Sequence, residues 1–383
     1  MAVYVDIADS VYNWALNQVR PDDYNRNAIE QILLWKNGKK KPTINQIEKI
    51  SNKLGLPFGY FFLDTPPKEK IPLIEFRTVD SIELDIPSRN LINTIHEMQR
   101  IQDWVEEYQI AEEFGKNRLV GIFDSKGDCL SLADLIRKEL ELPIDWYKNN
   151  KTVEDSFRFF KHLLSNFGII VMMNSVVDNN NYKKLNINEF RAFALINDYA
   201  PLIFINSNDS TNAKLFSLIH EFVHICFGEN SLYNDNSGQY TGKRKNEAIC
   251  NAITAELLVP EKMFLKTWQN ALDKEPEEII IELAKIFKCG TIVIARKALD
   301  NGFIDNILYK KIVNIAKSNF NKKKTGGQPE YYKTTLSRID NRFLLMLNSS
   351  VAEGRTSFEE AYRLTNTNRN TFDKLIAKLV DKL

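Results

Sequence analysis

The stretch Leu215–Gly228 reads LFSLIHEFVHICFG and carries two of the four histidines of the chain, His220 and His224. Residues i and i+4 lie on the same face of an α-helix, so both imidazoles can reach one metal ion. Glu221 lies about 100° further round the helix, next to any water on that ion. The spacing therefore predicts a metal site with a carboxylate base beside it, the arrangement that a zinc hydrolase needs.

The residues around the two histidines predict a buried helix. From Leu215 to Phe227 the sequence is mostly apolar outside the motif, and Gly228 is a good helix C-cap. The alternative is that both histidines are core residues satisfied by hydrogen bonds. Burying two imidazoles and a carboxylate without a strong partner costs several kcal/mol, which favours a metal.

A third ligand is expected on the next predicted helix, which runs from about Lys245 to Leu258. Glu247 is the first candidate, and Asn251 lies one turn later on the same face, where it can hold a ligating histidine. Glu256 is the alternative, but it is half a turn out of phase with Glu247, so one helix cannot direct both at the same ion. Two histidines and one glutamate leave an open fourth position, as in catalytic zinc sites.

Peptide hydrolysis also needs a group that stabilises the developing oxyanion. No histidine follows His224 in the sequence, so the candidates are Tyr233 and Tyr240 in the polar stretch 229–243. The alternative is that this stretch is a loop and that each tyrosine only anchors it, without a role in catalysis.

Three short apolar runs, at 169–173, 190–196 and 201–206, predict β-strands that precede the histidine helix. If the last of them lies at a sheet edge, it could pair an extended peptide substrate by strand addition.

Composition sets the broad class of the protein. The chain has 383 residues, enough for two or three domains, and a net charge of +1, which gives no general attraction to nucleic acid or membranes. The four cysteines are scattered without a CxxC pair, and no signal segment or membrane-length apolar run is present. We therefore expect a cytoplasmic protein without a membrane partner.

Residues 1–65 predict three helices with tight turns, a pattern typical of a helix-turn-helix bundle. The basic turn Lys39–Lys41 suggests DNA contact, but this segment has eight Lys/Arg against seven Asp/Glu. A DNA-binding head normally carries a clearer positive excess, so a solvated turn on an interaction bundle is the alternative.

The whole pattern predicts an α+β fold that is mainly helical. We expect four segments: a helix-turn-helix domain at 1–65, a linker and helical segment at 66–160, the metal-binding core at 161–265 and a helical domain at 266–383.

Two sets of residues carry a family resemblance. The first comprises Phe190–Phe193, Pro201–Asn206, Lys214–His224, Glu247–Asn251 and Ala255–Pro260. The second comprises Trp14-Ala15, Trp35–Gly38, Pro42-Thr43, Pro57–Leu63, Pro66-Pro67 and Glu75–Thr78. Together they resemble the ImmA/IrrE family of zinc metallopeptidases fused to an N-terminal XRE-type helix-turn-helix domain.

The resemblance implies a gluzincin-like core with a small β-sheet, flanked by helical N- and C-terminal domains. It implies that His220, His224 and Glu247 bind Zn²⁺, and that Glu221 activates a zinc-bound water. The activity would be limited proteolysis of a specific protein partner, such as an XRE-type repressor. Fused relatives also stand beside toxin genes, so the alternative is a non-catalytic antitoxin or a DNA-binding regulator of a toxin-antitoxin or mobile-element module.

Overall fold

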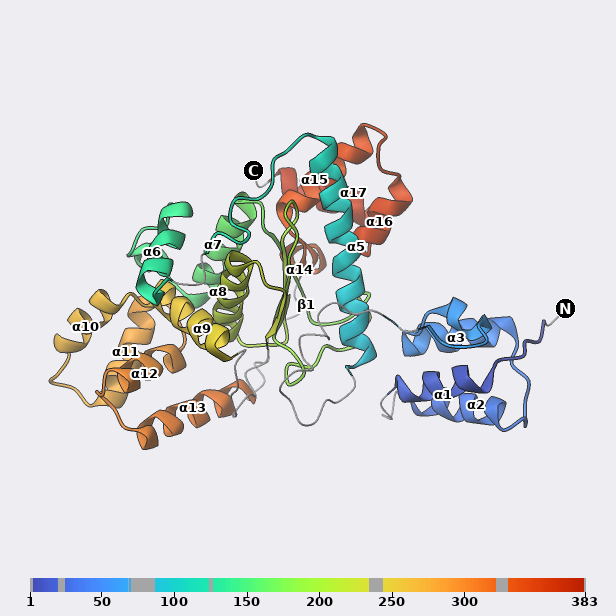
Figure 1. Ribbon diagram of the computed structural model, residues 1–383, viewed down its shortest axis with the longest axis horizontal. Helices are drawn as coiled ribbons and strands as arrows, with labels where there is room; N and C mark the ends of the chain where they lie inside the picture. The colour runs from blue at the N-terminus through green and yellow to red at the C-terminus, as the bar shows by residue number, and fades with distance from the viewer. Residues whose placement is uncertain are drawn as a thin grey trace. The chain divides into compact units, whose positions relative to one another are not determined.

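The computed structural model describes residues 3–19, 25–67, 69, 87–123, 127–233, 244–321 and 330–381. The chain divides into two compact units, coloured by residue number in Figure 1. The first comprises residues 1–99 and 176–185, and the second comprises residues 100–175 and 186–383.

The first unit contains a small helical bundle with its own core. Its elements are α1 (Asp9–Asn17), α2 (Arg26–Lys36), α3 (Ile44–Leu54) and the 3₁₀ helix η1 (Phe58–Phe62). At the start of α3, the Gln46 side chain accepts the backbone N–H of Thr43 at 3.0 Å. Gly55 ends the helix in the left-handed conformation, with φ of 69°. The three helices predicted for this segment are confirmed.

Helix α5 (Arg89–Ala111) contributes residues to both units. Its apolar residues recur at helical spacing, and the side on which they lie is buried. The buried residues are Leu91, Ile92, Ile95, Met98, Ile101 and Trp104.

The second unit contains a four-stranded sheet. Its strands are β1 (Ile170–Asn174), β2 (Ala192–Leu195), β3 (Leu202–Asn206) and β4 (Ser231–Tyr233), in the order β1-β3-β2-β4. Strands β1 and β3 are parallel, and the two other pairs are antiparallel. The three strands predicted from apolar runs are confirmed.

The condition for strand addition to β3 is not met, and the loop expected at 229–243 includes a strand. Strand β3 is not at an edge, because β1 and β2 flank it and all five of its residues are buried. A continuous apolar run is typical of such a central strand. In addition, the stretch 229–243, expected to be a loop, contributes the edge strand β4.

The outer edge of β1 is covered from the C-terminal part of the chain. Asp340, which is buried, accepts the backbone N–H of Val171 through Oδ2 at 3.3 Å. Its other oxygen accepts the Ser165 hydroxyl at 3.1 Å and the N–H of Phe343 at 3.0 Å. One carboxylate thereby caps a helix and accepts one N–H from the outer edge of β1.

Helices make up most of the second unit. They are α6 (Cys129–Glu139), η2 (Trp146–Asn149), α7 (Val153–Asn166), α8 (Thr211–Phe227), α9 (Arg244–Leu258), α10 (Glu261–Gln269), α11 (Pro276–Phe287), α12 (Thr291–Asp300), α13 (Asn306–Asn321), α14 (Tyr331–Arg338), α15 (Asn341–Ala352), α16 (Phe358–Thr365) and α17 (Arg369–Val380). The expected α+β, mainly helical fold is confirmed. Across the described part of the chain, every helix is too short or too polar to span a membrane.

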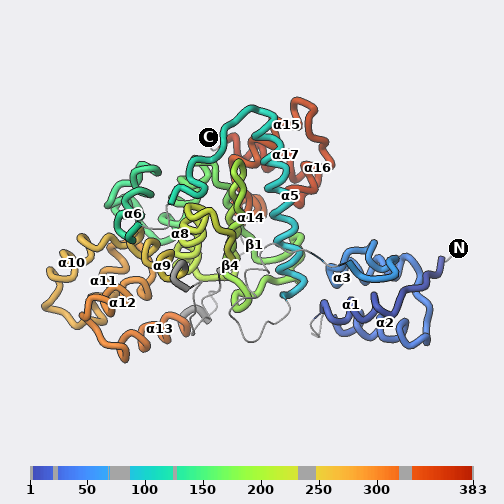
Figure 2. Tube along the Cα trace, in the orientation of Figure 1, coloured from blue at the N-terminus to red at the C-terminus, as the bar shows by residue number. Residues whose placement is uncertain are grey.

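Helix α8 lies at the centre of the second unit. It contacts β2, β3 and β4 on the side of the sheet, and α7 and α9 elsewhere on its surface. Figure 2 shows α8 and α9 side by side. Because neighbours surround α8, its apolar residues join one hydrophobic cluster that extends from α6 to α13.

Candidate metal centre

Local capping fixes both ends of α8. The Ser210 hydroxyl accepts the N–H of Ala213 at 3.2 Å, which satisfies one of the unpaired amides of the first turn. Just before it, Asp209 forms an ion pair of 2.6 Å with Arg191, the residue that precedes β2. Gly228 ends the helix with φ of 69°, as the sequence predicts. These contacts fix both ends of α8 and therefore the position of the two histidines beside the sheet.

The structure brings His220, His224 and Glu247 together. The Nε2 atoms of the two histidines lie 3.1 Å apart. Oε2 of Glu247 lies 3.2 Å from Nε2 of His220, and its Oε1 lies 3.3 Å from Nε2 of His224. Two histidines one turn apart on α8 and one glutamate from the first turn of α9 therefore present their ligand atoms to a single point.

This arrangement fits a tetrahedral ion. Zinc binds imidazole nitrogen and carboxylate oxygen at about 2.0–2.1 Å, so two ligand atoms of a tetrahedral site lie about 3.3–3.4 Å apart. The three distances, 3.1 to 3.3 Å, are close to this value, with each oxygen of Glu247 facing one histidine. The histidine side chains are buried, whereas that of Glu247 is 44% exposed. The cluster is therefore closed by α8 and accessible from the side of α9.

The electrostatics of the cluster reflect both its burial and the contacts among its members. Burial lowers the pKa of His220, and hydrogen bonds to Glu247 and Asn251 oppose that shift. Burial also acts to lower the pKa of His224, but contacts with Cys250 and Glu247 raise it well above its usual value. Burial acts to raise the pKa of Glu247, yet hydrogen bonds from the two histidines bring it far below the usual range. Glu247 is therefore ionised, as a metal-binding carboxylate must be.

Two neighbours of Glu247 on α9 contact the histidines. Asn251, one turn after Glu247, lies near enough to His220 to act on its pKa and raise it. Cys250 is fully buried, and its Sγ lies 3.9 Å from Nδ1 of His224. Partners on the far ring nitrogen fix the orientation of a ligating imidazole. Cys250 is therefore both a core residue and a contact of a candidate metal ligand.

Glu221 lies on α8 beside the two histidines and is fully buried. Its Oε2 accepts a hydrogen bond from the hydroxyl of Ser231, the first residue of β4. A hydroxyl that donates to a buried carboxylate offsets part of the cost of removing that charge from water. Glu221 is thus held between the metal-binding face of α8 and the edge of the sheet.

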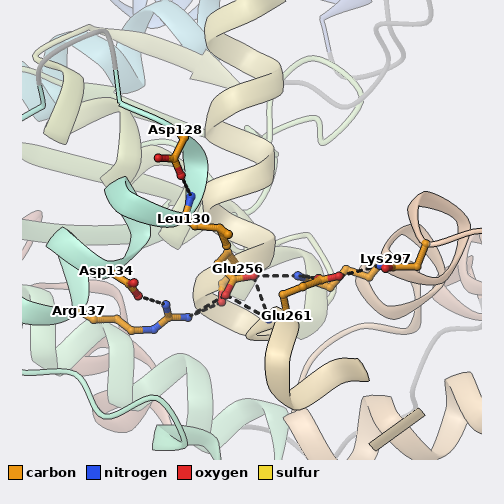
Figure 3. A network of polar contacts seen from close by, with 8 residues as sticks. Asp128, Leu130, Asp134, Arg137, Glu256, Glu261 and Lys297 are labelled. Carbon is orange, nitrogen blue, oxygen red and sulfur yellow. Dashed lines mark hydrogen bonds and ion pairs between the residues drawn. The ribbon is translucent and has the colours of Figure 1, made fainter. Parts of the chain in front are cut away.

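Glu256, the alternative third ligand, belongs to a separate ion network that Figure 3 shows. Its carboxylate accepts the N–H of Glu261 at 3.0 and 3.1 Å and the ammonium of Lys297 at 2.9 Å. Arg137 donates to its backbone carbonyl at 2.6 Å. These contacts occupy the carboxylate at the far end of α9, half a turn out of phase with Glu247 as expected.

The side chains of the two tyrosines considered for oxyanion stabilisation lie outside the described part of the chain. Tyr233 is the last residue of β4, and its side chain lies outside the described part of the chain. Tyr240 lies outside the described residues altogether. Their roles stay predictions.

Sequence reasoning missed Ser231 and the contact of Cys250 with His224. Cys250 is three residues after Glu247, and residues at i and i+3 share a helix face, so this spacing was an available signal. Ser231 belongs to a strand of three residues, which is too short for a periodic pattern to develop.

Comparison with known families agrees with the site. Residues 165–299, which include both histidines, Glu221 and Glu247, match the family model described as the IrrE N-terminal-like domain (Peptidase_M78). Residues 339–378 match a family described as a domain of unknown function (DUF8813). Searches of curated proteins and of solved structures found no match. The metallopeptidase likeness thus covers the central part of the chain and its candidate metal site.

Proposed function

We propose that the chain is a zinc-dependent endopeptidase with a gluzincin-like core, which regulates a specific protein partner by limited proteolysis. The observation that carries the proposal is the convergence of His220, His224 and Glu247, with the Glu221 carboxylate close enough to act on the pKa of His224. The match of residues 165–299 to a peptidase family supports the same reading.

His220, His224 and Glu247 would hold the ion. When bound, zinc would polarise the scissile carbonyl and make a water more acidic. Glu221 accepts a proton from the attacking water and passes it to the nitrogen of the leaving amine as the C–N bond breaks. The buried position of Glu221 keeps bulk water from competing for that proton.

The sheet offers a place for the substrate backbone. Among the described strands, β4 pairs only with β2, whereas on the outer edge of β1 Asp340 accepts the N–H of Val171. Ser231 of β4 also contacts Glu221. An extended peptide that adds to β4 would therefore lie beside the base, Glu221. Strand β4 thus takes the substrate-pairing role that the sequence first suggested for β3.

The helical bundle of the first unit supports a regulatory protein rather than a general protease. It is a compact unit with its own hydrophobic core, so it can recognise a partner independently of the metal site. The resemblance suggests an XRE-type repressor or a cognate toxin as the partner. The four cysteines are free, as is usual in a reducing cytoplasm, where we place the protein.

Profiling of new protein N-termini in cells tests the proposal. Cells that express the full chain should gain one or a few new N-termini, and cells that express Glu221→Gln should gain none. Both chains should bind one zinc ion, because Glu221 is not a ligand. If the variant still inactivates its partner while zinc stays bound, the protease proposal fails.

A second function is favoured by one observation on the first unit. Lys39, Lys40 and Lys41 are all exposed on the turn between α2 and α3. A DNA-binding regulator or antitoxin would use this surface without cutting. Steep salt dependence of duplex affinity, reduced by Lys39→Ala with Lys40→Ala, would support that function. No binding to promoter DNA at low salt would exclude DNA as the ligand.

A further inference from the structure

A buried hydrogen bond links the edge strand of the sheet to the residue between the two metal-binding histidines. The Ser231 hydroxyl donates to Oε2 of Glu221, and both side chains are almost completely buried. We propose that Ser231 is a positioning residue that fixes the orientation of the Glu221 carboxylate. This inference rests on the proposed function, because it assigns Glu221 as the base.

The backbone around Ser231 is fixed on several sides. Ser231 pairs with Ala194 in the antiparallel ladder between β4 and β2. Before it, the Asn230 side chain accepts the N–H of Ile196 at 2.6 Å, which extends the connection to the end of β2. The N–H of Glu229 donates to the carbonyl of His224 at 3.1 Å. The short connection 229–231 is therefore bonded to both α8 and the sheet, and it places the serine hydroxyl against Glu221.

The hydrogen bond selects one orientation of the carboxylate. A glutamate side chain has three rotatable bonds, and a fixed donor on one oxygen removes much of that freedom. With Ser231 on Oε2, we assign Oε1 as the oxygen that accepts the proton of the attacking water. Proton transfer depends on such geometry, because the base must lie within hydrogen-bond reach of its proton.

The position of Ser231 also links the base to the substrate. Ser231 lies on β4, the strand that we propose to pair with the substrate backbone. A single three-residue strand would then set the place of the peptide and the orientation of the base. Preorganisation of this kind favours the geometry of the reacting atoms before chemistry begins.

A metal-chelating probe tests the inference without knowledge of the substrate. The full chain is loaded with Co²⁺, and the affinity of acetohydroxamate is measured from the visible spectrum. A hydroxamate chelates a metal through two oxygens and donates a proton to an adjacent carboxylate. Its affinity therefore reports the orientation of Glu221 as well as the presence of the ion.

Four variants make the measurement specific. Glu221→Gln defines the loss when the carboxylate is absent, and Ser231→Ala removes the hydroxyl alone. Ser231→Thr retains a hydroxyl at the same place. Ser165→Ala is the matched control, because it removes a buried hydroxyl from the carboxylate of Asp340, at a site outside the metal cluster.

We expect Ser231→Ala to weaken hydroxamate binding roughly tenfold, the loss expected for one hydrogen bond to a charged group, with unchanged Co²⁺ affinity. Ser231→Thr should recover most of the affinity, and Ser165→Ala should lower the melting temperature without affecting hydroxamate. Wild-type affinity in Ser231→Ala, together with a clear loss in Glu221→Gln, overturns the role of Ser231 alone. A chain that binds no Co²⁺, or equal affinity in Glu221→Gln, overturns the proposed function and this inference together.

Discussion

Oε2 of Glu247 lies 3.2 Å from Nε2 of His220, although the two residues belong to different helices. The relationship depends on the packing of α8 against α9, because Glu247 stands in the first turn of α9. Its second oxygen reaches His224 in the same way. The candidate ligand set is therefore a product of tertiary structure and not of the histidine motif alone.

Removal of Glu247 should abolish tight zinc binding. We expect Glu247→Gln to weaken zinc affinity by at least about a hundredfold, since changes to groups that only support a ligand already cost about 10–100-fold. Titration against a competing chelator measures the effect. Glu256→Gln is the matched control, because Glu256 lies on the same helix but belongs to the ion network.

Zinc affinity close to that of the unchanged chain is expected for the folded fraction of Glu256→Gln. The opposite result, in which Glu256→Gln loses zinc and Glu247→Gln retains it, would make Glu256 the third ligand.

Loss of the Glu256 carboxylate should destabilise the second unit. Glu256→Ala removes the buried partner of the Lys297 ammonium and leaves it only the more exposed Glu261, so the cost should approach that of a broken buried ion pair, about 3–5 kcal/mol. Urea unfolding of the full chain measures the change. Glu282→Ala, which removes an exposed pair with Lys274, should have little effect. Equal stability of the two variants would show that the network contributes no more than a surface pair.

The end of α8 should be sensitive to the residue at position 228. Gly228 has φ of 69°, so Gly228→Ala should cost about 1–2 kcal/mol of unfolding free energy. Gly115→Ala is the control, because an added Cβ there meets no atom within 4 Å. If thermal unfolding shows the same small change for both variants, backbone conformation at position 228 is not a source of stability.

Lys161 should give the second unit a distinctive dependence on alkaline pH. It donates to the Ser337 carbonyl at 2.7 Å, and burial, partly opposed by Asp340, lowers its pKa to about 8 from 10.5. Between these values the unfolded chain binds more protons at this site, so the contribution of Lys161 to stability rises with pH. Below pH 8 the charged group carries its full cost.

Comparison with Lys161→Met isolates this effect. The unfolding free energy of the unchanged chain relative to the variant should increase from pH 8 to pH 10.5. A difference that stays constant over that range would mean that Lys161 has its ordinary pKa in the folded chain.

Much of the local structure was predictable from residue pattern. Helix α8 has capping residues at both ends and apolar residues on nearly all sides. Strands β1, β2 and β3 are apolar runs bounded by turn residues. The phase of a helix also separated Glu247 from Glu256 before any tertiary contact was considered. These features depend on neighbours in the sequence.

The strand order and the environment of the base were not predictable in this way. Whether β3 is central depends on its pairing with both β1 and β2, and Asp340 reaches β1 from the distant C-terminal part of the chain. Ser231 meets Glu221 only because β4 joins the far side of β2. Such contacts follow from global packing, which local periodicity does not encode.

Zinc K-edge X-ray absorption of the zinc-loaded full chain tests the central claim most directly. We predict nitrogen and oxygen neighbours at about 2.0–2.1 Å, with outer-shell scattering from the two imidazoles of His220 and His224 and a changed spectrum in Glu247→Gln. A sulfur neighbour at about 2.3 Å would contradict the account, because it would place Cys250 on the ion and close the position needed for catalysis.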